Sequence, residues 1–489
     1  MKNTMPVKIP SSGAIRWPII FPENTKPRIL LFFFAIIIQL FAAAISGVGF
    51  SLNRQFYWLA GTALWILWFA MMFIIAAPKT DVILRNYQNR LKKAALVLFG
   101  ILMMLGIFEL IMAFFLAPVF QNSGDFATLL EQMRHGFQYN DGTALEQQAT
   151  ENFLKGENPY AHANLIEAML KYDGSFDRVT PLRTGRLADV FPYPTQEQLK
   201  QIWDTAIHNP SQAPPEIESK VCYPAGFFLI PAPFVVAGIT DMRIIYFIFV
   251  IAGLAYAVWK VPKKNKFILI AFAVISLELW NSLADGETGS IVFPFLLIAW
   301  MSLGKNRWTS AIAMGLAVTT KQTAWFYLPF YLILLWHRTG LKSLIFTGAV
   351  IVMVFILTNA YYIVLDPGLW LTSILSPMKD PMFPIGVGLV NITTSGLVNI
   401  KSPLPFTILE ILTFIGAIIW YIRNCARYPL AGVLISVLPL FFAWRSLWSY
   451  FFYVPMIMLT CMLLESDTDL DTSNYKITPN VHKAFENVS

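Results

Sequence analysis

Carboxylates are the side chains of this sequence best suited to acid–base chemistry. The chain has 29 Asp and Glu residues but only five histidines, which are dispersed. It contains no GxxxxGK(S/T) phosphate loop, no GxSxG elbow, no HExxH pair and no CxxC pair. If the chain is an enzyme, we therefore expect its general acid or base to be Asp or Glu.

One polar segment combines an acid with a helical pattern and a turn that ends the helix. It reads Asp141-Gly-Thr-Ala-Leu-Glu-Gln-Gln-Ala-Thr-Glu-Asn-Phe-Leu-Lys-Gly-Glu-Asn158-Pro-Tyr160. The apolar spacing between Thr143 and Leu154 predicts a short amphipathic helix, and Asn-Pro ends it. Because Asp is a favoured N-cap, Asp141 has two interpretations, a helix cap or a catalytic base.

The elements around this segment are expected to be membrane helices. Of the 489 residues, 56% are hydrophobic and only 13% are charged, and the mean hydropathy is +0.57. A soluble domain carries about twice that charged fraction. The apolar residues form blocks that match the ~20 residues of a membrane-spanning helix. This composition excludes a cytoplasmic enzyme, a disulfide scaffold and a DNA-binding domain.

The hydropathy pattern predicts an all-α integral membrane protein with about twelve transmembrane helices. A further apolar segment, 222–238, is expected to be a re-entrant or juxtamembrane helix, because counting it as a crossing places three later basic clusters on the wrong side. The twelve expected spans are 28–50, 56–77, 94–117, 243–259, 267–281, 291–303, 308–320, 324–336, 343–364, 405–422, 428–444 and 450–464.

Basic clusters in the short loops set the expected orientation. They lie at 79–93, 260–266, 305–307, 338–342 and 423–427, and basic loops mark the cytoplasmic side. We therefore interpret the net charge of +7 as topology rather than as a sign of a nucleic-acid partner. Both termini are expected to be cytoplasmic, with the plasma membrane as the default location and membrane lipids as the surroundings.

The expected organisation has four parts along the chain. A tail, 1–27, precedes two helices in 28–93, a membrane module spans 94–464, and a disordered tail, 465–489, follows. Within the module, the segment 118–220 is expected on the outer side. It holds fourteen acidic and eight basic residues.

The polar segment 141–160 resembles the first outer loop of the GT-C superfamily of lipid-sugar-dependent glycosyltransferases. The closest likeness is to the polyprenol-phosphate-mannose transferases of glycosyltransferase family 87, in which an Asp precedes a short helix that ends in Gly-x-Asn-Pro-Tyr. The resemblance covers about 94–450. Four further motifs keep the family's order: Tyr223-Pro-Ala-Gly, Gly286-Glu-Thr-Gly, Gly315-Leu-Ala-Val-Thr-Thr-Lys321 with Pro329, and Asp366-Pro…Trp370…Pro377…Gly386-Val-Gly388. The chain departs from the family at two positions: it has Ala225 where the family has Pro, and Glu287 where the family has Gln.

The resemblance implies an inverting glycosyltransferase at the outer membrane face. It would move mannose, or a related hexose or pentose, from a polyprenyl-phosphate donor to a glycolipid or glycan acceptor. One carboxylate can take the acceptor's proton in an inverting displacement, whereas retention needs a second, nucleophilic carboxylate. Asp141 is the expected base. Asp125, in Ser-Gly-Asp-Phe, is the alternative, although it lacks the spacing to the Asn-Pro-Tyr turn.

Two cations are expected to bind the donor phosphate. The leaving group is a lipid phosphate, and its developing charge calls for a cation at the membrane surface. Lys321 and Arg445 both fall at the outer ends of expected spans. The alternative for both residues is snorkelling toward lipid headgroups.

Four more residues are expected to contact substrate: Asn158, Tyr160, Tyr223 and Glu287. Asn158 and Tyr160 have the alternative of only shaping the turn and anchoring it at the interface. Glu287 and nearby acids could bind an acceptor or a divalent cation such as Mg²⁺ or Mn²⁺, or form a solvated turn. The sequence predicts no metal-ligand set.

Two other functions stay open at this stage. A transporter or lipid-carrier flippase is expected to show repeated halves with broken helices at the membrane midplane. This chain has no internal repeat, and its polar residues gather on one expected face, which favours an enzyme. A non-catalytic assembly subunit, whose outer segment binds a partner, is the third interpretation.

Overall fold

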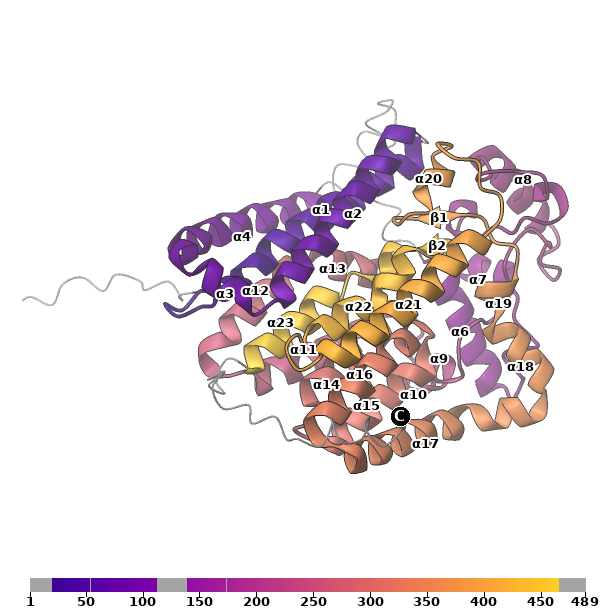
Figure 1. Cartoon of the computed structure of the whole chain (residues 1–489). Helices are drawn as coiled ribbons and strands as arrows, with labels where there is room; N and C mark the ends of the chain where they lie inside the picture. Colours follow the sequence, from indigo (N-terminus) through magenta and orange to yellow (C-terminus); the bar gives the residue numbers. More distant parts are fainter. Residues whose placement is uncertain (1–19, 53, 112–138, 173, 466–489) are drawn as a thin grey trace, which may run out of the picture.

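The protein is mostly helical, as the sequence predicts (Figure 1). The computed structural model describes residues 20–52, 54–111, 139–172 and 174–465. Asp125 and most of the two terminal tails lie outside these residues. In the described part of the chain, the all-α membrane fold class is confirmed.

Seven helical segments in the described chain are long and apolar enough to cross a membrane. Each matches one of the expected spans, with ends that shift by at most two residues, except that the third, Arg85–Ile111, begins nine residues before the expected 94–117. They are Pro27–Phe50 in α1 (Pro27–Leu52), α2 (Gln55–Ala76), Arg85–Ile111 with α4 (Gln88–Ile111), α11 (Met242–Lys260), α17 (Leu341–Leu365), α21 (Leu404–Asn424), and Trp448–Glu465 with α23 (Val454–Glu465).

The count of twelve crossings is not confirmed, because five expected spans are short or broken. The span expected at 267–281 bends by 51° between its two helices and could count as an eighth crossing. The other four are helices of 11 to 17 residues, and a 14-residue helix covers about 21 Å of the ~30 Å hydrocarbon core. These elements are α12 (Lys266–Ile275), α13 (Leu277–Ala284), α14 (Gly289–Ser302), α15 (Arg307–Thr320), α16 (Thr323–Thr339) and α22 (Ala431–Phe441).

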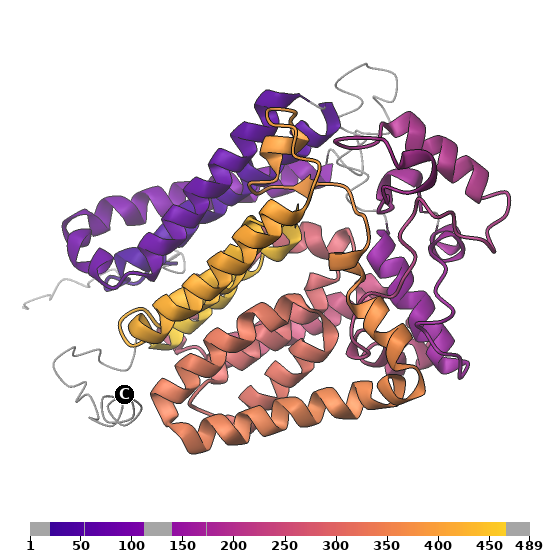
Figure 2. The ribbon, with the colours of Figure 1, turned by 45° about the vertical axis from the view of Figure 1, so that its right-hand side comes forward.

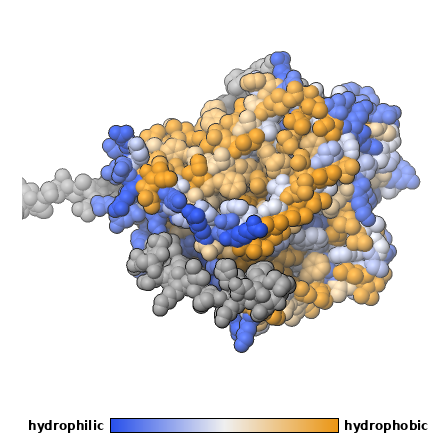
Figure 3. Space-filling model, viewed as in Figure 1, coloured by the Kyte–Doolittle hydropathy of each residue, from blue (hydrophilic) through white to orange (hydrophobic). Residues whose placement is uncertain are grey.

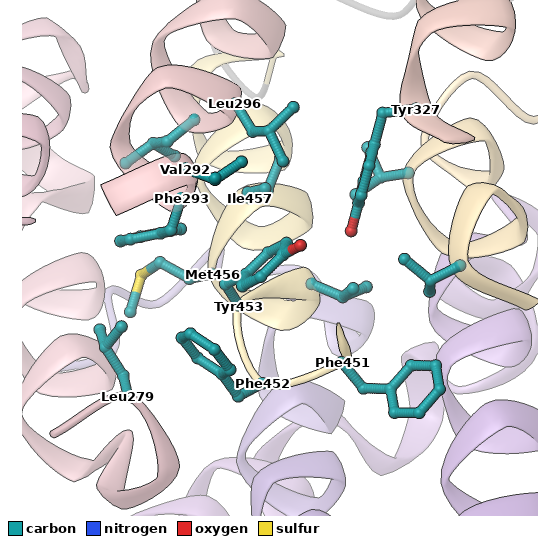
Figure 4. Close-up of a cluster of buried hydrophobic side chains, with 14 of the residues drawn as sticks. Leu279, Val292, Phe293, Leu296, Tyr327, Phe451, Phe452, Tyr453, Met456 and Ile457 are labelled. Atoms are coloured by element: carbon teal, nitrogen blue, oxygen red, sulfur yellow. The ribbon is translucent and has the colours of Figure 1, made fainter. Parts of the chain in front are cut away.

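Burial inside the bundle lets these short helices exist. Nearly every residue of α14 is buried, so its ends meet protein instead of lipid. Figure 4 shows Phe293 and Leu296 of α14 facing Tyr453, Met456 and Ile457 at the start of α23. Hydropathy identifies such a helix as apolar, but it does not distinguish burial in protein from burial in lipid.

Most of the remaining helices gather at one end of the bundle, which we call the loop end. Figures 1 and 2 both place α6, α7, α8, α18 and α19 there, while the turns between α16 and α17 and between α21 and α22 lie at the opposite end. The loop-end helices are α6 (Asp141–Leu154), α7 (Leu165–Lys171), α8 (Gln196–Ala206), α18 (Pro367–Ile374), α19 (Ser376–Lys379) and α20 (Asn391–Thr394), and the segment expected at 222–238 forms α9 (Gly226–Leu229) and α10 (Ala232–Val236).

The surface follows this division. Figure 3 shows hydrophobic side chains over the middle of the visible face and hydrophilic side chains toward two opposite ends. The basic turn α3 (Lys79–Ile83) is held to α1 by the Arg28–Asp81 ion pair, at 2.7 Å. The polar segments thus lie at the ends of an apolar bundle, as expected for a membrane protein.

A short parallel pairing fixes one loop at the loop end. β1 (Ile385–Gly386) pairs with β2 (Arg445–Ser446), with Ile385 opposite Arg445. A Cβ at Gly386 would lie 2.1 Å from the Ser446 carbonyl oxygen, and one at Gly388 would lie 1.9 Å from that of Phe441. The two glycines of the Gly-Val-Gly motif therefore permit a backbone approach that no other residue allows.

Candidate functional site at the loop end

Asn140, rather than Asp141, caps helix α6. The Asn140 side chain accepts a hydrogen bond from the Thr143 backbone N–H at 2.9 Å. Asp141 is then the first helical residue, where an acid interacts favourably with the helix dipole. The cap interpretation of Asp141 is wrong, and its carboxylate is left for other contacts.

The first turn of α6 is clasped to the turn that follows α13. Asn140 Nδ2 donates to the carbonyl oxygens of Asp285 and Gly286, both at 3.1 Å, and the Thr143 hydroxyl also donates to the Gly286 carbonyl. Gly286 has φ +72°, in the region that favours glycine. This clasp brings the 141–160 motif against the Gly286-Glu-Thr-Gly motif.

Lys321 reaches the same turn from the end of α15. Its Nζ lies 2.5 Å from the Thr288 hydroxyl and 5.3 Å from the centre of the Tyr223 ring, while the Tyr223 hydroxyl is 3.4 Å from that of Thr288. Lys321 is only 6% exposed. We call Asp141, Tyr223, Glu287, Thr288 and Lys321 the acid–lysine site.

Opposite charges interact across the acid–lysine site. Burial lowers the pKa of Lys321, and the Glu287 carboxylate opposes that shift. Burial likewise raises the pKa of Glu287, which Lys321 lowers again, and Glu287 also has a hydrogen bond with Ser449. The Asp141 charge acts on both groups. A cation and two carboxylates therefore share one partly desolvated space.

The Asp141 carboxylate is oriented by two hydrogen bonds. Its Oδ1 accepts the Gly142 backbone N–H at 2.7 Å, and its Oδ2 accepts the Thr180 hydroxyl at 2.7 Å. Asp141 is only partly buried. Since each carboxylate oxygen has two lone pairs, both keep a position that can accept a further proton.

Arg445 approaches the site from β2. Arg445 and Asp141 both act electrostatically on Tyr193. Burial raises the pKa of Tyr193 to about 12, the Arg445 charge lowers this pKa and the Asp141 charge raises it. The Arg445 Nη1 group is buried, and no residue in the described part of the chain accepts a hydrogen bond from it. A guanidinium with one buried N–H donor left unpaired is suited to bind an anion.

Asn158 and Tyr160 contact the acid–lysine site through Tyr223. The Asn158 side chain accepts the Tyr160 backbone N–H at 3.1 Å, and the Tyr160 hydroxyl donates to the Tyr223 carbonyl at 2.9 Å. The Tyr160 ring packs against Phe228 and Tyr362. These contacts shape the turn and fix Tyr223, and substrate contact by the two residues stays a prediction.

Asp285 adds an ion pair beside the clasped turn. Its carboxylate lies 2.6 Å from the Arg178 guanidinium, and burial raises its pKa to about 7 despite that partner. Among the residues that the structure describes, no three or more His, Cys, Asp or Glu side chains are grouped to hold a metal ion.

Five residues at or beside the site did not follow from the sequence: Asn140, Arg178, Thr180, Tyr193 and Thr288. Thr288 lies inside the quoted Gly-Glu-Thr-Gly motif, so its position was within reach of the sequence. Thr180 and Arg178 come from a segment without helical or strand periodicity, and no local pattern marks them.

Comparison with known proteins identifies no relative. No protein-family model matches the chain, and no curated protein or solved structure is recognisably similar to it. The likeness to GT-C transferases therefore rests on the five motifs quoted above.

Proposed function

We propose that this membrane protein is an inverting glycosyltransferase that uses a polyprenyl-phosphate sugar at the acid–lysine site. The observation that carries the proposal is the electrostatic interaction of the Asp141 carboxylate with the buried Lys321 ammonium, which contacts Thr288 beside an apolar bundle. A carboxylate and a cation are the two groups that this displacement requires.

In the proposed reaction, Asp141 acts as general base. Its carboxylate takes the proton of an acceptor hydroxyl, the hydroxyl oxygen forms a bond to the anomeric carbon, and the bond from that carbon to the phosphate oxygen breaks. The electron pair leaves with the lipid phosphate. Lys321 and Arg445 stabilise the phosphate charge, and Tyr223 and Glu287 line the sugar or acceptor position.

The proposal also assigns an orientation. The loop end would face the outer side of a cell membrane and the basic loops the cytoplasm, with mannose or a related sugar as the donor group and a glycolipid or glycan as the acceptor. The positive-inside distribution of the basic loops supports this assignment.

The acceptor chemistry follows from the site. A half-exposed carboxylate beside the partly exposed acid Glu287 can bind sugar hydroxyls without a dedicated metal. No ligand set for a divalent cation is part of the proposal, since no three His, Cys, Asp or Glu side chains of the described chain are grouped to hold one.

A transporter or lipid flippase is the second candidate, and one feature favours it. The pair α12–α13 is bent by 51° within the bundle, and broken helices form the binding sites of many transporters. The enzyme proposal is preferred, because the oriented carboxylate and the buried lysine lie at the loop end.

Transfer assays with Asp141→Asn test the proposal. Membranes with wild type, Asp141→Asn or the control Asp189→Asn, which changes an exposed acid of the same segment, would receive polyprenyl phosphates carrying labelled mannose, glucose or arabinose and a lipid and glycan extract. We expect transfer by wild type and the control but not by Asp141→Asn. Equal transfer by all three would remove Asp141 as the base and leave Asp125. If wild type transfers no sugar from any donor, the enzyme proposal is wrong.

A further inference from the structure

The Asp141 carboxylate is bound by a residue far away in the sequence. Thr180 Oγ1 lies 2.7 Å from Asp141 Oδ2. A carboxylate has no hydrogen to donate, so the threonine hydroxyl is the donor. A hydrogen bond to an ionised acceptor is among the stronger ones in proteins, and it fixes the plane of the carboxyl group.

Thr180 is itself held by backbone contacts with two other segments. Its carbonyl oxygen accepts the Glu218 N–H at 2.9 Å. The next two residues continue the attachment through antiparallel β-bridges, Pro181 with Ile217 and Leu182 with Met382. We call Thr180–Arg183 the strap.

The strap joins the loop-end segments on both of its sides. The Leu182 N–H donates to the Glu216 carbonyl at 2.8 Å, and the Arg183 N–H donates to the Pro381 carbonyl at 2.7 Å. Residues 381 and 382 lie three to four residues before β1, which pairs with the strand that carries Arg445. The position of the Thr180 hydroxyl is therefore fixed, because the backbone of the strap is hydrogen-bonded to a different segment on each side.

We propose that Thr180 is the positioning residue for Asp141: its hydroxyl, held by the strap, orients the carboxylate for proton transfer. This inference rests on the proposed function for its catalytic consequence. The orientation itself is a property of the folded protein and can be measured without transfer activity.

The alternative role for this hydrogen bond is purely structural, as a tie between the strap and α6. The two roles differ in what the loss of the hydroxyl changes. A structural tie affects stability, whereas a positioning residue changes the reactivity of the Asp141 oxygens and the rate of the chemical step.

Three variants separate the two roles. Thr180→Val keeps the branched shape and removes the donor, and Thr180→Ser keeps the donor. Thr184→Val is the matched control, because the Thr184 hydroxyl donates to the Pro215 carbonyl at 2.6 Å in the same loop. The groups whose charges interact with Asp141 stay the same in all three variants: Tyr193, Cys222, Tyr223, Asp285, Glu287 and Lys321.

The first readout is the rate of carbodiimide labelling of Asp141 at one fixed pH in the full-length, detergent-solubilised protein, followed by mass spectrometry. The reagent adds to a carboxyl oxygen, and in wild type the Thr180 hydroxyl is hydrogen-bonded to Oδ2. Removing that hydrogen bond frees the oxygen, so we expect Thr180→Val to be labelled ~10-fold faster. Wild type, Thr180→Ser and Thr184→Val should share one rate.

The second readout is the transfer assay. We expect kcat of Thr180→Val to fall ~10-fold, with KM for the donor nearly unchanged and Thr180→Ser close to wild type. An unchanged labelling rate, an unchanged kcat, or an equal change in Thr184→Val would overturn the positioning role. If wild type transfers no sugar but Thr180→Val is still labelled faster, the glycosyltransferase proposal is rejected and the Thr180–Asp141 contact is kept.

Discussion

Lys321 and Arg445 present different kinds of positive charge to the site. Lys321 is buried, already contacts Thr288, and is compensated by Glu287. Arg445 keeps a buried donor that no described residue uses. Lys321 is thus suited to a fixed position beside the reacting phosphate, and Arg445 to a second contact with the same anion.

Replacing Lys321 tests the first of these roles. We expect Lys321→Met to reduce kcat by about 100-fold or more, since a charge-stabilising donor to the leaving group is lost. Lys321→Arg should recover only part of the rate, because the planar guanidinium does not occupy the position of an ammonium group. Steady-state kinetics with the labelled donor would measure both effects.

The control for Lys321 is Lys155→Met, at the exposed end of α6. It removes the same charge from the same face without touching the acid–lysine site. Equal losses in Lys155→Met and Lys321→Met would mean that only the general charge of the loop end matters, and the assignment of Lys321 to the phosphate would fail.

At the scale of elements, the turn between α13 and α14 determines the geometry of the site. α6 clasps this turn through Asn140 and Thr143, and the turn delivers Glu287 and Thr288. At Gly286 a left-handed backbone and a close neighbour coincide, because an added Cβ would lie 2.9 Å from the Thr143 hydroxyl oxygen.

We expect Gly286→Ala to lower both stability and activity. The left-handed backbone and the contact with Thr143 should together cost about 2–3 kcal/mol of unfolding free energy. Gly156→Ala is the matched control: Gly156 has φ +80° but nothing within 4 Å of an added Cβ, so it should cost only about 1 kcal/mol. Thermal unfolding in detergent would compare the two, and a larger loss in Gly156→Ala would contradict the clasp.

The sequence predicted elements better than it predicted their contacts. The seven long spans, from α1 to α23, followed from hydropathy alone, and α6 followed from its helical spacing. The Asn140 cap was one residue away from the acid that the sequence singled out. Thr180 was out of reach, because its partner lies 39 residues away and irregular backbone has no periodicity from which to infer its position.

The count of spans was missed for a related reason. Hydropathy responds to apolar composition, which is equally high in a lipid-facing helix and in a buried one. α14 is apolar and almost wholly buried, whereas only 11% of the α4 span is buried. Only the packing of neighbouring helices distinguishes the two, and that information is distributed over the whole chain.

At the scale of the whole molecule, two acidic groups tie the loop-end segment to the loop before β1. Glu218 is 6% exposed and shares a hydrogen bond with Asp380, whose Oδ2 lies 2.5 Å from Lys220 Nζ. The Glu218 backbone also holds Thr180. We therefore expect the protonation of this pair to affect the strap and, through Thr180, the position of Asp141.

Burial and the neighbouring Asp380 raise the pKa of Glu218 from 4.5 to about 7. A raised carboxyl pKa means that the folded protein keeps a proton that the unfolded chain releases near pH 4.5. The stabilisation is therefore complete below pH 4.5 and is lost as pH rises to about 7, with an upper limit of about 3 kcal/mol. We expect the strap to open more readily at pH 8 than at pH 5.

Hydrogen exchange of the Glu218 and Leu182 amides, corrected for intrinsic rates, would measure this opening. In wild type, protection should fall between pH 5 and pH 8. In Glu218→Gln it should be nearly constant, because the amide stays neutral while keeping the shape of the side chain. Glu197→Gln, at an exposed position of α8, should behave like wild type. If protection in wild type does not change with pH, Glu218 and Asp380 do not share a proton. The pair would then be linked to Asp141 only through the backbone hydrogen bond between Glu218 and Thr180.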